Sequence, residues 1–218
     1  MTTATADVIT STAPAIAAIQ AHLDRETDAL LATLPDPAQL SAEQRRGIIA
    51  RYAAVLEGNF IYWMTGAYIA AGSDDARAKI IDNLREEIRD CHPGMMRRFA
   101  TAAQAAPTQQ DAEAVSRDLM NVRLFIGKLA AVPNVVAMAF FEGFIQRFMP
   151  YLADLASRQG SSELEYTDVH GVCDITHTQE LFRALETELA LTAPLPPEAT
   201  FEGVGLLRTL IETIVVTQ

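Results

Sequence analysis

Apolar residues recur at intervals of three and four positions along nearly the whole chain, and clear alternation with a period of two is absent. Because an α-helix has about 3.6 residues per turn, this spacing gathers apolar side chains on one helical face. The pattern therefore predicts a helical protein. Two local signals mark helix starts: Ser41 to Gln44 has the form of a capping box, and Pro93 suits the first turn of a new helix.

The apolar spacing, with prolines and glycines as breaks, divides the chain into predicted helices. Their approximate ranges are 14–33, 41–71, 74–90, 93–104, 110–130, 134–158, 163–191 and a last helix that follows Pro197. No internal repeat or domain boundary is evident. We therefore expect residues 1–218 to form a single all-α domain, a bundle of about seven helices.

The charge balance limits the possible partners. The chain has 28 acidic and 17 basic residues, a net charge of −11. Nucleic acids and anionic lipids both require a basic surface, so neither is expected as a partner. No signal peptide and no apolar run of about 18 residues are evident, and two cysteines are too few for a disulfide scaffold. We expect a cytoplasmic protein with a small-molecule substrate. Whether it forms a homodimer is left open.

Two glutamates are isolated in apolar surroundings. Glu57 is the only charged residue of 52–73, and Glu142 is the only one of 129–146. Helices that are apolar on most faces are buried, so both side chains are expected to point inward. A buried carboxylate needs a cation or hydrogen-bond donors to offset its desolvation. The alternative for each is a single exposed position on an otherwise buried helix.

A second pattern combines histidines with carboxylates. His170, Asp174 and His177 are spaced i, i+4 and i+7 and form one stripe on a helix. His92 follows Glu87 at a predicted helix break. Imidazole and carboxylate groups are typical ligands of first-row transition metals. Together with Glu57 and Glu142, the carboxylates Glu87 and Asp174 carry four negative charges, which two divalent ions would neutralise. The chain contains no Glu-x-x-His motif, which disfavours a ferritin-like di-iron fold.

This pattern resembles the heme-oxygenase-like diiron oxidases and oxygenases, which share the seven-helix heme oxygenase fold. The matching motifs span about 120 residues and are Glu57 in Val-Leu-Glu-Gly, Asn-Leu-x-x-Glu87 with His92, Glu142 in Phe-Phe-Glu-Gly, and His170-x3-Asp174-x2-His177. The resemblance implies one iron held by Glu57, His92 and His170 and another held by Asp174, His177 and Glu142, with Glu87 bridging. Glu86 stays open as a substitute for Glu87.

The resemblance also implies an activity. Family members use two Fe(II) ions, with Mn possible in their place, and O2 as co-substrate, through a peroxo-diferric species. We expect an oxidase or oxygenase of an amino-acid-like metabolite, acting by N-oxygenation, desaturation or C–C cleavage, with no catalytic residues beyond the metal ligands. Arg123 and Lys128 are candidate anchors for a substrate carboxylate.

Other functions remain open at this point. They are a diiron fatty-acid decarboxylase that forms a terminal alkene, and a metal-free helical binding protein. A heme enzyme that uses His22 would leave the inward carboxylates unexplained. A thiaminase-like enzyme would need Cys91 or Cys173 as nucleophile, but a cysteine next to a helical ligand is expected to point away from the site.

Overall fold

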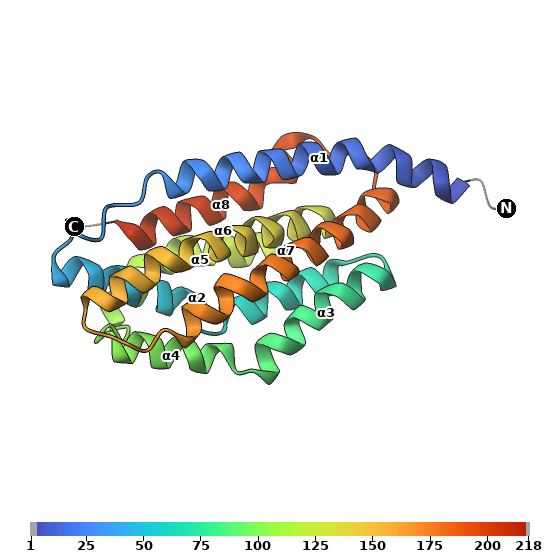
Figure 1. Cartoon of the computed structure of the whole chain (residues 1–218). Helices are drawn as coiled ribbons and strands as arrows, with labels where there is room; N and C mark the ends of the chain where they lie inside the picture. Colours follow the sequence, from blue (N-terminus) through green and yellow to red (C-terminus); the bar gives the residue numbers. More distant parts are fainter. Residues whose placement is uncertain (1–3, 217–218) are drawn as a thin grey trace.

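The computed structural model describes residues 4–216, with side chains from residue 12 onward. Within this range the chain forms α-helices and no strand, which confirms the all-α prediction (Figure 1). The eight helices of the described range are α1 (Ala4–Leu31), α2 (Ala42–Ala70), α3 (Asp74–Arg89), α4 (His92–Ala102), α5 (Gln109–Ile126), α6 (Ala131–Arg158), α7 (Glu165–Leu191) and α8 (Pro197–Val215).

The predicted number of seven helices is too low by one for the described residues. The chain breaks sharply between α3 and α4, where Cys91 adopts a left-handed conformation with φ 57° and ψ 46°. Pro93 follows in the first turn of α4, where its missing N–H is harmless. The first helix also begins earlier than predicted, at Ala4, so that Pro14 lies inside it. The predicted capping box is confirmed, since Ser41 and Gln44 exchange hydrogen bonds at the start of α2.

Helix α6 lies at the centre of the bundle, and α7 packs along it (Figure 1). Helix α6 is buried on nearly all sides, as its apolar sequence predicts. Helix α1 runs along one side of the bundle near α8, and α3 and α4 lie on the opposite side. Because α7 contacts α3, α4 and α6, side chains from all four helices meet along one face of α7. In the described part of the chain, no helix combines the length and apolarity that crossing a membrane requires.

Helix α2 is interrupted near its middle. Glu57 has ψ 93° and Gly58 has φ 85°, values outside the helical region. A positive φ of this size is readily adopted by glycine, which has no Cβ. The interruption divides α2 into two halves, and residues on both sides of it, Leu56, Phe60 and Ile61, line a cavity that also borders buried polar side chains.

Candidate metal centre

Six of the seven predicted ligands lie together where α3, α4, α6 and α7 meet. Each is at most 6 % exposed. They are Glu87 of α3, His92 of α4, Glu142 of α6, and His170, Asp174 and His177 of α7. The three side chains of α7 point inward from one face, as their helical spacing predicts.

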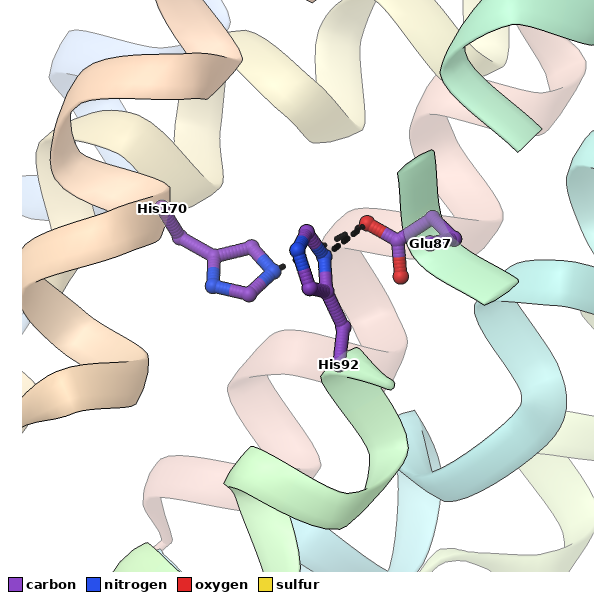
Figure 2. Close-up of side chains that lie close together, drawn as sticks. All are labelled: Glu87, His92 and His170. Carbon is purple, nitrogen blue, oxygen red and sulfur yellow. Dashed lines mark hydrogen bonds and ion pairs between the residues drawn. The ribbon is translucent and has the colours of Figure 1, made fainter. Parts of the chain in front are cut away.

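The first group consists of Glu87, His92 and His170, which point toward one another in Figure 2. His92 Nδ1 lies 2.7 Å from Glu87 Oε1, and His170 Nε2 lies 3.8 Å from the same oxygen. The two imidazole rings are 4.5 Å apart between centroids. Two imidazoles and a carboxylate so close together are a suitable set of donors for a transition metal.

The backbone fixes the orientation of His170. Its Nδ1 lies 2.8 Å from the carbonyl oxygen of Tyr166, one turn earlier in α7. A carbonyl oxygen only accepts hydrogen bonds, so Nδ1 carries a proton. In the neutral ring, Nε2 then presents its lone pair toward Glu87, where a metal ion could bind it. The ring of Tyr166 also packs on the imidazole, with 4.1 Å between centroids.

The second group consists of Glu142, Asp174 and His177. His177 Nδ1 lies 3.6 Å from Asp174 Oδ1 and 3.7 Å from Glu142 Oε1. Among the described residues, neither His177 Nδ1 nor Asp174 Oδ2 has a hydrogen-bond partner, although both atoms are buried. Asn83 Nδ2 donates to Glu142 Oε1 over 2.6 Å. Buried polar atoms without partners are costly, and a bound cation would satisfy both of them.

Glu86 and Glu87 take different positions. Glu87 belongs to the first group, whereas Glu86 Oε2 lies 2.9 Å from Nε2 of His177 in the second group. A carboxylate that holds the outer nitrogen of an imidazole is typical of metal-binding histidines. The sequence pointed to Glu86 only as a substitute for Glu87. The sequence could have separated the two, because neighbouring residues of a helix point about 100° apart and therefore contact different residues.

Glu57 does not point into this site, contrary to the prediction from its apolar surroundings. Its side chain is 36 % exposed and forms an ion pair with Arg97 of α4. The physical reason is the interruption of α2 at Glu57 and Gly58, which sequence periodicity did not predict. A ligand role for Glu57 stays a prediction that requires the side chain to move.

The buried groups alter one another's pKa values. Burial and the charge of Asp174 raise the pKa of Glu142 to about 7. Burial opposes the charge of Glu87, but His170 and His92 outweigh it and lower the pKa of this carboxyl to about 2. Burial likewise opposes the charge of His177, but the carboxylates of Asp174, Glu142 and Glu86 raise its pKa to about 11. Near neutral pH, Glu87 is therefore ionised and ready to bind a cation, whereas His177 and part of the Glu142 carboxyl hold protons that a metal ion would displace.

Both groups border one cavity. Glu87, His92, Glu142, His170 and Asp174 form its polar side. Most of the remaining wall is apolar and includes Leu56, Phe60, Ile61, Met96, Phe141 and Ile145. The cavity has a volume of about 20 Å³, which is room for about one water molecule or ion.

The other residues considered from the sequence lie in varied places. Cys173 does not point away from the site as expected, because its thiol donates to Asp174 Oδ1 over 3.1 Å. Burial and the charge of Asp174 raise the pKa of this thiol, so it stays protonated. Cys91 is exposed, and His22 of α1 packs on Phe201 with 4.0 Å between ring centroids.

The predicted carboxylate anchors are engaged elsewhere. Arg123 donates to Asn59 over 2.8 Å, and Lys128 pairs with Glu202 over 2.6 Å. Neither cation is among the described residues that border the cavity.

A family model described as an iron-containing redox enzyme, of the heme-oxygenase-like kind, matches residues 49–207. The match covers more than half of the chain and includes all seven predicted ligands. The chain belongs to this family. A comparison with curated proteins found no match. The donor set of this iron-containing redox enzyme is consistent with the membership, since mixed imidazole and carboxylate ligands suit iron.

Proposed function

We propose that this iron-containing redox enzyme binds two iron ions and uses them with O2 to oxidise a small organic substrate. The observation that supports the proposal most is the pair of buried ligand atoms without hydrogen-bond partners among the described residues, Asp174 Oδ2 and His177 Nδ1. The first group, Glu87, His92 and His170, lies beside them and borders the same cavity as Asp174. Bound as Fe(II), such ions supply the electrons that activate O2.

The proposal divides the ligands between two ions. His92, His170 and Glu87 would hold one ion. Glu142, Asp174 and His177 would hold the other. Glu87 lies in the first group, and its role as a bridge between the ions is part of the proposal. The same donors also accept Mn(II).

Residues around the ligands keep them in place. The carbonyl of Tyr166 fixes the ring of His170, and Glu86 holds the outer nitrogen of His177. Asn83 orients the carboxylate of Glu142. Such outer contacts position ligands before a metal arrives and limit the rearrangement that binding requires.

The proposed substrate is an amino-acid-like metabolite with an apolar side chain. The apolar wall of the cavity favours an apolar group next to the ligands. The same wall favours a second candidate, a medium-chain fatty acid that would be decarboxylated to a terminal alkene. The engagement of Arg123 and Lys128 elsewhere removes a reason to prefer the more polar substrate.

The test begins with anaerobic addition of Fe(II), followed by removal of free metal and elemental analysis. We expect two iron ions per chain, and a transient visible absorption with O2 uptake after O2 is added. His177→Ala should lose turnover while its circular dichroism stays helical. A wild-type protein that retains no iron and shows no absorption change would contradict the proposal. Screening amino acids and medium-chain fatty acids for O2 consumption then separates the two substrate classes.

A further inference from the structure

A second cavity lies on the side of the bundle away from α3 and α4 (Figure 1). It is a groove with a volume of about 370 Å³, and most of its wall comes from α1, the connector between α7 and α8, and the start of α8. None of the described residues that line it borders the cavity at the candidate metal centre. Its volume is within the range of pockets that bind small organic molecules.

The wall of this groove is mainly apolar. Helix α1 contributes Ala15, Ala18 and Ile19, while Leu195 of the connector and Phe201 of α8 complete the apolar part. The connector is rich in proline, which restricts the backbone. This part of the wall is therefore largely formed before a ligand arrives, which lowers the entropic cost of binding.

One arginine at the groove has no partner. Arg25 of α1 is exposed and borders the groove. The structure describes all 17 lysine and arginine side chains, and Arg25 is the only one of them without a hydrogen bond or ion pair to another described residue. The chain has 28 acidic residues, so a cation without a partner is unexpected. Arg25 is thus available to an anion from outside the chain.

The carboxylates near Arg25 on α1 are engaged elsewhere. Asp28, one turn further along, pairs with Arg147 of α6 over 2.6 Å, and Glu26 pairs with an arginine of α8. Asp24 borders a different cavity, between α1, α6 and α7. The positions four before and four after Arg25 are alanines. A ligand that carries a carboxylate would supply the missing charge.

The cation and the apolar residues lie on one face of α1. Ala15, Ala18, His22 and Arg25 follow one another at intervals of three and four positions, so their side chains share a face. At a rise of 1.5 Å per residue, this face extends over about 15 Å. It is apolar at one end and cationic at the other, with the imidazole next to the cation. An extended alkyl chain that ends in a carboxylate has the same arrangement.

We propose that this groove binds a straight-chain carboxylic acid of medium length, with the carboxylate at Arg25 and the alkyl chain along Ala18 and Ile19. The charge of the ligand matches the free cation, and burial of the alkyl chain supplies most of the affinity. The site goes beyond the proposed function, because it lies apart from the candidate metal centre and requires no metal.

Substitution at the apolar end tests the binding of the chain. Isothermal titration of the metal-free protein with decanoate, below the concentration at which it forms micelles, measures the affinity. Ala18→Glu places a charge where the alkyl chain binds, and we expect it to lower the affinity at least about tenfold. Ala17→Glu is the matched control, because Ala17 is an equally exposed neighbour that does not line the groove. It should leave the affinity unchanged.

Substitution of Arg25 tests the binding of the carboxylate. Arg25→Ala should lower the affinity for decanoate about three- to fivefold and remove most of its dependence on salt concentration. Arg25→Lys keeps the charge and should retain most of the affinity. Arg158→Ala is the matched control, since it removes an exposed cation of α6 that pairs with Asp154. Decanol, which has the same chain without the charge, should bind the wild type and Arg25→Ala equally well.

Several results would overturn this site. They are a wild type that binds no decanoate, equal affinity in the wild type, Ala18→Glu and Arg25→Ala, and binding that His177→Ala abolishes but Ala18→Glu does not. The last result would place the ligand at the candidate metal centre. Because the titrations contain no metal, failure of this proposal leaves the two-iron enzyme untouched.

Discussion

Asp174, in the first half of α7, and Glu188, in its last turn, are buried carboxylates, and each is 1 % exposed. Glu188 accepts hydrogen bonds from the backbone N–H groups of Gly72 and Ser73 and from the Ser73 hydroxyl, all within 3.0 Å. Asp174 receives one thiol hydrogen bond from Cys173, and its Oδ2 has no partner among the described residues. The protein thus supplies hydrogen-bond donors to both oxygens of Glu188, whereas one oxygen of Asp174 receives none from the described residues.

The difference separates a structural carboxylate from a candidate ligand. A buried carboxylate is costly unless hydrogen bonds or opposite charges offset its desolvation. The bonds to Glu188 fix the turn between α2 and α3 against α7, so its charge contributes to the fold. Asp174 has fewer such contacts: His177 Nδ1 lies 3.6 Å from its Oδ1, and its Oδ2 has no partner among the described residues, so a bound cation would supply the missing compensation. Burial alone does not identify a metal ligand, whereas a buried carboxylate oxygen without a partner, close to histidines and other carboxylates, does point to one.

The largest expected effect is the loss of metal binding in Asp174→Ala. Structural metal sites gain roughly 10 to 16 kcal/mol from about four ligands, so one ligand is worth about 2.5 to 4 kcal/mol, which is roughly a hundredfold to a thousandfold in affinity. Elemental analysis after dialysis against Fe(II) or Mn(II) measures the loss. Glu188→Ala should retain the wild-type metal content. Equal metal content in both variants would remove the distinction between the two carboxylates.

The next largest effect is on the stability of Glu188→Ala. Its substitution leaves two N–H groups and one hydroxyl without their acceptor, so the unfolding free energy should fall by about 3 kcal/mol. Urea denaturation of the metal-free protein measures this change. Glu180→Ala, which removes an ion pair with Arg183 on the same helix, should cost less than about 1 kcal/mol. A similar cost for both substitutions would show that the bonds of Glu188 are unimportant.

A smaller effect is expected for Glu86→Ala, which removes the outer partner of His177. Loss of such a contact typically weakens metal binding about 10- to 100-fold. Glu86→Gln should recover part of the affinity, because its amide oxygen still accepts a hydrogen bond from the imidazole. Isothermal titration with Mn(II) distinguishes the variants. Wild-type affinity in Glu86→Ala would mean that Glu86 does not position His177.

The smallest expected effects are changes in unfolding free energy when each carboxylate is replaced by its amide. They give the most direct comparison, because the chemical change is the same at Asp174 and at Glu188. Asp174→Asn removes a buried charge that is only partly compensated, so the metal-free protein should keep its unfolding free energy or gain up to about 1 kcal/mol. Glu188→Gln removes a satisfied acceptor, so it should lose about 1 to 2 kcal/mol. Denaturant titrations of the two variants at neutral pH measure both changes. Changes of the same sign would contradict the contrast.

Prediction from sequence succeeded where one continuous helix sets the geometry. The spacing of His170, Asp174 and His177 fixes their common face regardless of the rest of the fold, and Glu142 follows from the apolar run around it. Glu57 has the same local pattern, but its helix is interrupted. A single glycine inside an apolar helix does not reveal such a break, because tertiary contacts decide whether it forms.

The side-chain contacts between different helices could also not be predicted from local sequence patterns. Which of Glu86 and Glu87 meets His177 depends on how α3 rotates against α7, and that rotation is set by packing. His92 reaches the first group because Cys91 turns the chain in a left-handed conformation. The break itself was predicted from Pro93, but its direction was not. The thiol of Cys173 was expected to point away, yet it reaches the neighbouring Asp174.

The narrowness of the cavity determines the rate at which molecules reach the ligands. Its volume of about 20 Å³ admits a molecule of the size of water or dioxygen. An organic substrate must first displace wall side chains such as Leu56, Phe60 and Ile61. For the proposed organic substrate, the opening of the wall, rather than diffusion, would therefore limit the association rate.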